Sequence, residues 1–264
     1  MADDTTPALR MELEGSLAYL IINNPARLNA LTAAMWAALP QRLADAEADA
    51  NVRVIVLKGA GGKAFSAGAD ISEFDTARTG NAAHAYDALN HAAFEALLGT
   101  TKPTIAMIEG FCLGGGLGIA ACCDLRMAND AAQFAIPAAR LGLGYHPRWV
   151  RTLLKLAAPA SVKELLFTGR RFNSAEAANM GLVNRVVAKD QLEAETRALA
   201  GVIADNAPLT VKAAKAAIDT LTDKPETADI GRLEALVKNC FESADYAEGR
   251  KAFAEKRKPQ FKGV

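Results

Sequence analysis

Two loops rich in glycine and alanine have the composition to present backbone N–H groups to a carbonyl oxygen. They are residues 65–70 (FSAGAD) and residues 114–116 (GGG). Small side chains let a substrate approach the main chain, and glycines that open a helix add the positive end of its dipole. Two N–H groups aimed at one oxygen stabilise the negative charge of an enolate. The loops therefore indicate a site for a carbonyl compound such as a thioester.

Other chemistries find less support in the sequence. The triple glycine is not followed by the Gly-Lys-Ser/Thr of a phosphate loop and lacks the G-x-G-x-x-G spacing of a dinucleotide site. The cysteines at positions 112, 122, 123 and 240 show no metal-ligand spacing, so reduced thiols and no metal are expected. A serine hydrolase is an alternative, with Ser66 beside the first loop, but no G-x-S-x-G motif is present.

Side chains that could move protons are few and lie mainly around residue 145. Tyr145 either returns a proton to a substrate or fills the core. His146 either shuttles protons near neutral pH or lies in a solvent-exposed turn, and Arg148 could hold a substrate carboxylate. Asp70 adjoins the first loop, where an aspartate more often caps a turn than transfers a proton.

The overall composition predicts a protein with a large core and no nucleic-acid partner. Of the 264 residues, 51% are hydrophobic, and 30 basic residues balance 30 acidic ones. This balance argues against binding to nucleic acid or to an anionic membrane. No apolar stretch reaches the ~20 residues of a membrane span, and the N-terminal residues lack the apolar region of a signal peptide. We expect a cytoplasmic protein.

Strands and helices alternate in the first part of the chain, which predicts an α/β core with a helical C-terminal third. Thr32 is an expected N-cap for a helix that Pro40 should kink or split. The turn at residues 206–208 is the expected boundary between core and tail. Strands are expected at 15–23, 52–58, 104–108, 124–128 and 182–187, and helices at 32–49, 80–98, from 117, and at 147–157, 160–167, 174–180, 190–205, 208–222 and 226–254.

Taken together, several motifs resemble the crotonase family, also called the enoyl-CoA hydratase/isomerase family. They occur in the same order and at consistent separations along nearly the whole chain. They are residues 24–31 (NPARLNAL), 64–71 (AFSAGADI), 102–103 (KP), 109–116 (EGFCLGGG), 123–124 (CD), 167–169 (FTG), 181–184 (GLVN) and 253–257 (FAEKR).

The resemblance implies a fold, a substrate and a set of site residues. The fold is α/β, with a ββα spiral core over residues 1–205 that binds acyl-CoA. Residues 206–264 form a helical oligomerisation region, giving a homotrimer or a dimer of trimers. No cofactor is implied beyond the coenzyme A of the substrate. The oxyanion-hole N–H groups come from Ala69 and Gly115. The implied acyl-CoA contacts, with Lys256 often supplied by a neighbouring subunit, are Arg27, Leu28, Ala67, Ala69, Asp70, Ile71, Gly115 and Lys256.

The chain departs from the family pattern where hydratases carry two glutamates, because Gly118 and Ala138 occupy those positions. Adding water to a double bond needs a base and an acid, which neither residue supplies. Residues 141–145 look more like the family's methylmalonyl-CoA decarboxylases, which have a tyrosine matching Tyr145 but a histidine in place of Ala69. Three functions are therefore open: an enoyl-CoA hydratase/isomerase-type lyase or isomerase, a malonyl-type decarboxylase, and a catalytically silent acyl-CoA-binding protein.

Overall fold

The chain forms two β-sheets, and strands that follow one another along the chain are divided between them. The computed structural model describes residues 8–73, 80–223 and 225–264. The six-stranded sheet has the order β1 (Ala8–Glu14), β2 (Leu17–Asn23), β3 (Val54–Gly59), β5 (Thr104–Ile108), β7 (Leu125–Asn129) and β10 (Arg185–Val187). The four-stranded sheet has the order β4 (Ala64–Ser66), β6 (Phe111–Leu113), β8 (Gln133–Ala135) and β9 (Phe172–Asn173). From β3 to β8, consecutive strands alternate between the two sheets, which produces the repeated ββα course of a spiral.

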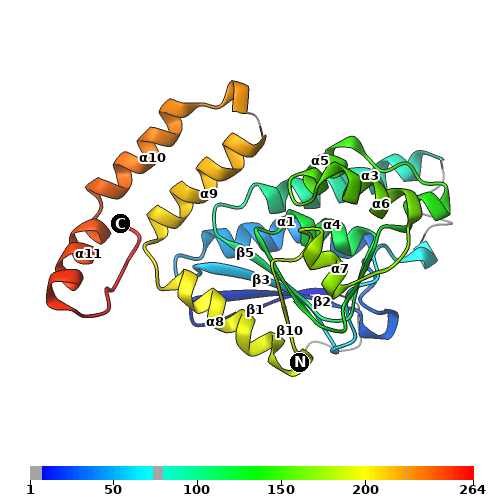
Figure 1. The fold of residues 1–264 in the computed structure, drawn as a ribbon, viewed down its shortest axis with the longest axis horizontal. Helices are drawn as coiled ribbons and strands as arrows, with labels where there is room; N and C mark the ends of the chain where they lie inside the picture. The colour runs from blue at the N-terminus through cyan, green and yellow to red at the C-terminus, as the bar shows by residue number, and fades with distance from the viewer. Residues whose placement is uncertain (1–7, 74–79, 224) are drawn as a thin grey trace.

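Helices cover both faces of the large sheet. Along β2, the side chains of Leu20 and Ile22 join one core cluster, and those of Tyr19 and Ile21 join the other. This period of two buries both faces, as expected for a mostly parallel sheet. Figure 1 shows the helices, which are α1 (Ala33–Ala48), α3 (Gly80–Leu98), α4 (Gly115–Cys122), α5 (Pro147–Leu154), α6 (Pro159–Thr168), α7 (Ser174–Asn179), α8 (Leu192–Ala204), α9 (Pro208–Asp223), α10 (Ile230–Glu242) and α11 (Ala244–Glu255).

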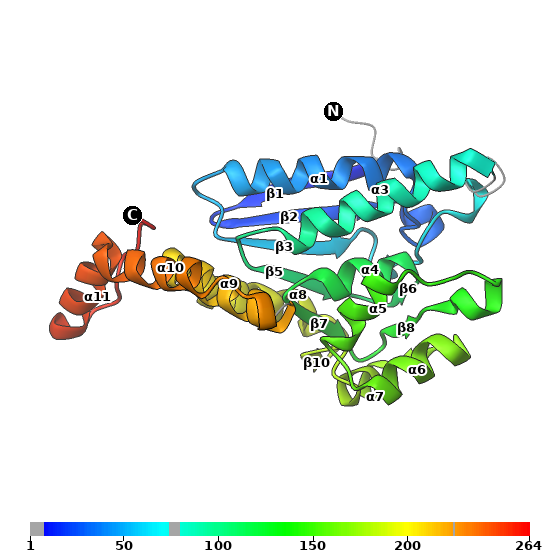
Figure 2. The same cartoon turned by 90° about the horizontal axis from the view of Figure 1, so that it is seen from above.

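The last three helices extend away from the sheets. Figures 1 and 2 show α9, α10 and α11 leaving the sheet-containing body beyond α8. The chain turns between Ala204 and Pro208, which is where the sequence predicts the boundary. Among the described residues, no helix is long and apolar enough to cross a membrane.

The structure corrects two expectations about helices: the helix is not split at Pro40, and the expected helix over 226–254 is not continuous. Helix α1 runs without a break through Pro40, capped at Thr32 as predicted. Leu39 and Leu43 are buried on its inner face, so packing offsets the hydrogen bond that the proline removes. The expected helix over 226–254 is two helices, because Ser243 ends α10 and caps α11 by accepting a hydrogen bond from the Tyr246 amide.

Candidate functional site

The two glycine-containing loops lie against each other. The Leu31 amide donates to the Gly68 carbonyl at 2.7 Å, and the Asp70 amide donates to the Leu31 carbonyl at 2.9 Å. Because peptide groups alternate in direction along an extended segment, the Ala69 amide points away from Leu31. A Cβ atom on Gly68 would lie 3.3 Å from the Gly115 nitrogen, and Gly68 has a φ of +95°. Only glycine fits this close approach without strain.

The amides of Ala69 and Gly115 have no hydrogen-bond acceptor among the described residues. Gly115 is the first residue of α4, where the N–H groups have no partner in the helix. Within the described ranges, no hydrogen bond from either amide is found. A Cβ atom on Gly115 would lie 3.9 Å from the Ala69 nitrogen. The fold therefore brings together the two amides that the sequence singles out.

Beside these amides, three aromatic side chains form what we call the aromatic wall: Trp36, Phe94 and Trp149. The Phe94 ring centroid lies 5.4 Å from that of Trp36 and 4.4 Å from that of Trp149, both in edge-to-face geometry. Trp36 is 2% exposed, and its indole N–H donates to the Tyr86 hydroxyl at 3.1 Å. The wall is therefore rigidly packed.

The aromatic wall occupies the space beside the glycines of α4. A Cβ atom on Gly118 would lie 2.7 Å from Phe94 Cζ, and one on Gly115 would lie 2.9 Å from Trp36 Cζ2. A glutamate at position 118 thus has no room unless Phe94 moves. Sequence reasoning missed the wall because its members come from separate segments. One signal was present in the sequence: glycines on one face of a helix leave space that large aromatic side chains can fill.

The second position without a glutamate lies in a short turn. Ala138 belongs to a 3-10 helix (Pro137–Leu141), and its carbonyl accepts a hydrogen bond from the Leu143 amide at 2.9 Å. Tyr145 follows, partly buried against the main core cluster. Burial, and then the nearby Cys122 thiol, raise the pKa of the Tyr145 hydroxyl above its usual value. This hydroxyl remains protonated at neutral pH and can act only as a proton donor there.

His146 and Arg148 have structural partners. The His146 Nδ1 atom caps α5 by accepting a hydrogen bond from the Arg148 amide at 3.2 Å. The Arg148 guanidinium forms an ion pair with Glu95 at 2.6 Å and lies 3.4 Å from His91 Nε2. All four side chains are exposed, so a substrate carboxylate would have to compete with Glu95 for Arg148.

Most of the expected CoA-contacting residues gather at one edge of the first loop. Arg27 forms an ion pair with Asp70 at 2.9 Å, and Asp70 also accepts hydrogen bonds from Ser72. Burial alone raises the pKa of Asp70, but the hydrogen bonds from Ser72 and Arg27 outweigh it and hold the pKa below its usual value. The Leu28 carbonyl accepts from the Ala67 amide at 2.9 Å.

Two further features surround this edge. Ile71, the residue after Asp70, is 69% exposed, which leaves its side chain free for a ligand. A cavity of about 330 Å³ opens beside Leu28 and is also lined by Lys63 and Lys189. Lys63 and Lys189 bring positive charge to this edge, where Lys189 also forms an ion pair with Glu109 at 3.5 Å.

Lys256 is not brought to this edge. It is the C-terminal cap residue of α11, and Figures 1 and 2 show α11 at the far end of the helical extension, away from α1 and α3. Within one chain, Lys256 is therefore separate from the other expected contacts. In the described part of the chain, no three His, Cys, Asp or Glu side chains are grouped closely enough to hold a metal ion.

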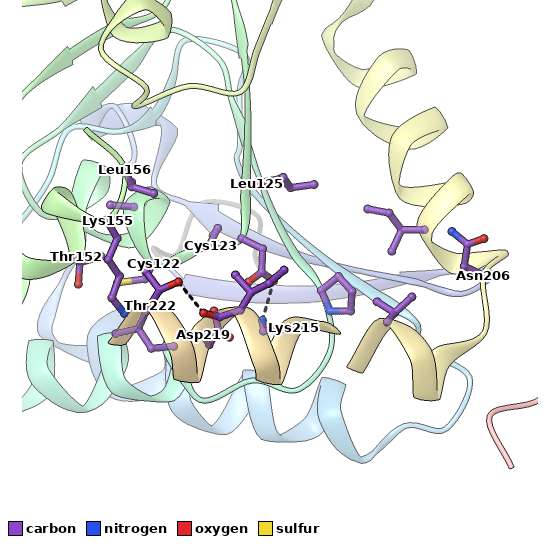
Figure 3. A pocket seen from close by; sticks show the side chains of 17 residues that line it. Cys122, Cys123, Leu125, Thr152, Lys155, Leu156, Asn206, Lys215, Asp219 and Thr222 are labelled. Carbon is purple, nitrogen blue, oxygen red and sulfur yellow. Dashed lines mark hydrogen bonds and ion pairs between the residues drawn. The ribbon is translucent and has the colours of Figure 1, made fainter. Parts of the chain in front are cut away.

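Another cavity, about 470 Å³, lies elsewhere, between the end of α4, α5 and α9 (Figure 3). Its lining combines aliphatic side chains with polar and charged ones, including Lys155, Lys215 and Asp219. A partly buried ion pair between Lys215 and Asp124, 2.7 Å apart, belongs to the lining. Cys122 and Cys123 lie on the opposite side from α9, and burial raises the pKa of both thiols, so they stay protonated.

Comparisons with known proteins agree with this architecture. Residues 12–264 match the family model described as enoyl-CoA hydratase/isomerase. The chain is 37% identical over 251 residues to a short-chain-enoyl-CoA hydratase of Clostridium acetobutylicum, covering 94% of this chain and 95% of the relative. It is 36% identical to a crotonyl-CoA hydratase of Syntrophomonas wolfei, covering 95% and 96% of the two chains.

A solved structure shows the same fold. The crystal structure of an enoyl-CoA hydratase/carnithine racemase from Magnetospirillum magneticum superposes with a TM-score of 0.91 at 38% identity, covering 97% of this chain and 96% of the other. The spiral of ββα units and the C-terminal helices are thus shared along nearly the whole length. On these matches, the resemblance in the motifs is confirmed: the chain belongs to the enoyl-CoA hydratase/isomerase, or crotonase, family.

Proposed function

We propose that this chain binds an acyl-CoA thioester and stabilises its enolate with the amides of Ala69 and Gly115. The observation that carries this proposal is the pair of unpaired amides in two touching loops. A thioester oxygen gains negative charge when its α-carbon loses a proton, or when its α-carboxylate departs as CO₂. Donors fixed in place before the reaction stabilise that charge without reorganising.

The CoA part of the substrate would lie along the edge formed by Arg27, Leu28, Ala67, Asp70 and Ile71. The lysines of the cavity beside Leu28 supply positive charge for phosphates. Lys256 would reach this edge only from a neighbouring subunit, which supports assembly as a trimer or a dimer of trimers. Exposed apolar side chains on the helical extension, including Val237, Phe241 and Phe253, offer surface for that contact.

Within this function, the family name indicates hydration or isomerisation of an enoyl-CoA, as a lyase or isomerase. A second candidate, decarboxylation of a malonyl-type CoA, is favoured by one observation: Phe94 fills the space beside Gly118. In that reaction the bond from the α-carbon to the carboxylate breaks. Its electron pair forms the enolate, CO₂ leaves, and a proton returns to the α-carbon. Tyr145, protonated at neutral pH, or water would supply that proton.

A substrate panel tests the proposal. Purified protein is assayed for hydration of crotonyl-CoA, isomerisation of a 3-enoyl-CoA and decarboxylation of methylmalonyl-CoA, with CoA-ester binding measured by calorimetry. Decarboxylation without hydration is the result that the aromatic wall favours. Strong hydration would overturn the view that the missing glutamates matter. Binding without any turnover would identify a silent acyl-CoA-binding protein, and no binding of any ester would end the proposal.

A further inference from the structure

We propose that Phe94 closes the acyl end of the site and limits the substrate to short acyl groups, and that the large cavity beyond it is an unused extension of the acyl site. This inference rests on the proposed function, since it concerns the acyl group whose thioester oxygen the Ala69 and Gly115 amides would hold. The chemical class of substrate is therefore a short acyl-CoA.

Helix α4 runs from the Ala69 and Gly115 amides to the large cavity. Gly115 opens the helix beside Ala69, and Ala121 and Cys122 at its other end line the 470 Å³ cavity. Gly115 and Cys122 are seven positions apart on the helix, about 10 Å at 1.5 Å per residue. An acyl chain that followed α4 from the thioester would pass Gly118 midway.

Phe94 stands on that path. The absence of a side chain at Gly118 lets the Phe94 ring seat directly against the helix, since even a Cβ atom there would lie 2.7 Å from Cζ. Phe94 belongs to α3, and Leu98 four residues later lines the cavity. Residues four apart on a helix are neighbours on one face. The cavity thus begins about one helical turn beyond the Phe94 ring.

The ring is held in place from both sides. Trp36 and Trp149 contact it edge to face, and Phe94 is 5% exposed. A rotation of Phe94 would have to displace two tryptophan rings. The Phe94 ring is therefore a fixed part of the packed core and not a mobile side chain.

Beyond the Phe94 ring, the aliphatic residues that line the cavity can contact an acyl chain. The volume of the cavity falls in the range of small-molecule sites, and its lining includes Leu98, Leu156, Ile203 and Ile218. Figure 3 shows Lys215, Asp219 and Thr222 of α9 along its opposite wall.

The test measures binding, so that its outcome does not depend on which reaction occurs. The dissociation constants of butyryl-, octanoyl- and dodecanoyl-CoA are determined by calorimetry for the wild type, Phe94→Ala and Phe94→Leu. We expect the wild type to bind butyryl-CoA at least tenfold more tightly than dodecanoyl-CoA. Phe94→Ala should remove or reverse this preference, with Phe94→Leu between the two, because each step opens the path further.

Controls separate the possible failures. Phe172→Leu removes a buried ring from β9 in the small sheet, and should leave the chain-length preference unchanged. If Phe94→Ala does not fold, Phe94→Leu still decides. In Phe94→Ala, adding Leu98→Trp should refill the entrance and restore the short-chain preference. Variants that keep the wild-type preference, or a wild type that binds dodecanoyl-CoA as tightly as butyryl-CoA, would overturn this inference alone. A wild type that binds no CoA ester would instead overturn the proposed function.

Discussion

The candidate site has a main-chain half and a side-chain half, and they differ in how they are built. In the main-chain half, Ala69 and Gly115 offer amides, and their side chains are nearly absent. In the side-chain half, Trp36 and Phe94 pack against the glycines of α4 and Trp149 packs on Phe94, which leaves no room for a carboxylate at position 118. The main-chain half can stabilise negative charge, and the side-chain half can exclude water and large groups.

This contrast indicates how one fold can support different reactions. The main-chain half depends on loop geometry that any family reaction through an enolate could use. The side-chain half decides which acids, bases and acyl groups reach the reacting carbons. A change of reaction can therefore come from filling a space as well as from replacing a catalytic side chain.

The largest expected effect comes from removing one amide of the main-chain half. Proline is tolerated at the first position of a helix, where its missing N–H costs no helical hydrogen bond. Gly115→Pro should lower kcat/KM for the active acyl-CoA by about 10²–10³, the cost of losing one oxyanion donor. Steady-state kinetics on the substrate identified by the panel provide the measurement.

Gly115→Ala is the matched control for that variant. It introduces the same Cβ atom, 2.9 Å from Trp36 Cζ2, but keeps the N–H group. The alanine variant should retain at least tenfold more activity than the proline variant. Equal losses in the two variants would mean that crowding against Trp36, and not the amide, causes the defect.

Tyr145 tests whether the side-chain half supplies a proton. Tyr145→Phe keeps the ring that packs on the core and removes only the hydroxyl. Loss of a general acid typically costs 10²–10⁴, so we expect kcat to fall about 10²-fold with an unchanged melting temperature. Because burial raises the pKa of Tyr145, the wild-type rate should show no Tyr145-linked loss across neutral and mildly alkaline pH. Unchanged turnover in Tyr145→Phe would restrict this residue to packing.

The two halves also differ in how far the sequence predicts them. Glycines at positions 68 and 114–116 reveal backbone geometry directly, because a positive φ or a close approach excludes other residues. Phe94 carries no such mark in the sequence. Its role depends on Gly118 from the next helix and on Trp149 from α5, and those contacts exist only in the folded chain.

The fold shows the same division. Long apolar or amphipathic runs, such as residues 80–98 and 104–108, form the helix and strand that their patterns predict. The strands of the small sheet were missed, because β4 and β6 are only three residues long and lie within glycine-containing turns. Strand β1 was missed too, since most of its side chains are not buried, leaving little apolar periodicity.

A smaller effect, on stability, tests the packing of the side-chain half. Gly118→Ala should lower the free energy of unfolding by about 1–3 kcal/mol, because overpacking strains a dense core. Gly118→Glu should cost more, since it also buries a carboxylate, and it should not create hydratase activity. Urea denaturation gives the free energies. Adding Phe94→Ala should reduce the cost of either change by at least about 1 kcal/mol, the coupling expected of contacting residues. Purely additive losses would show that Phe94 does not fill this space.

The smallest expected effect concerns the edge of the main-chain half, where Asp70 holds Arg27 and Ser72. The pKa of Asp70 is lower in the folded protein than its ordinary value of 3.8, so folding favours the ionised carboxylate. Its contribution is fully present above the unfolded pKa and is lost as the pH falls through the folded pKa. At neutral pH, Asp70→Asn should destabilise the protein by only about 1 kcal/mol, because Arg27 is half exposed and water screens the pair.

That difference should shrink as the pH is lowered below the unfolded pKa of about 4, because the Asp70 carboxylate of the unfolded wild-type chain then takes up a proton before that of the folded chain does. Urea unfolding of the wild type and Asp70→Asn over a pH series measures it. Asp190→Asn, an exposed aspartate on another surface segment, provides a control that should show no such trend. A stability difference that grew towards acid pH would mean that Asp70 is bound in its protonated form. The Arg27–Asp70 contact would then not be an ion pair that orders the CoA-binding edge.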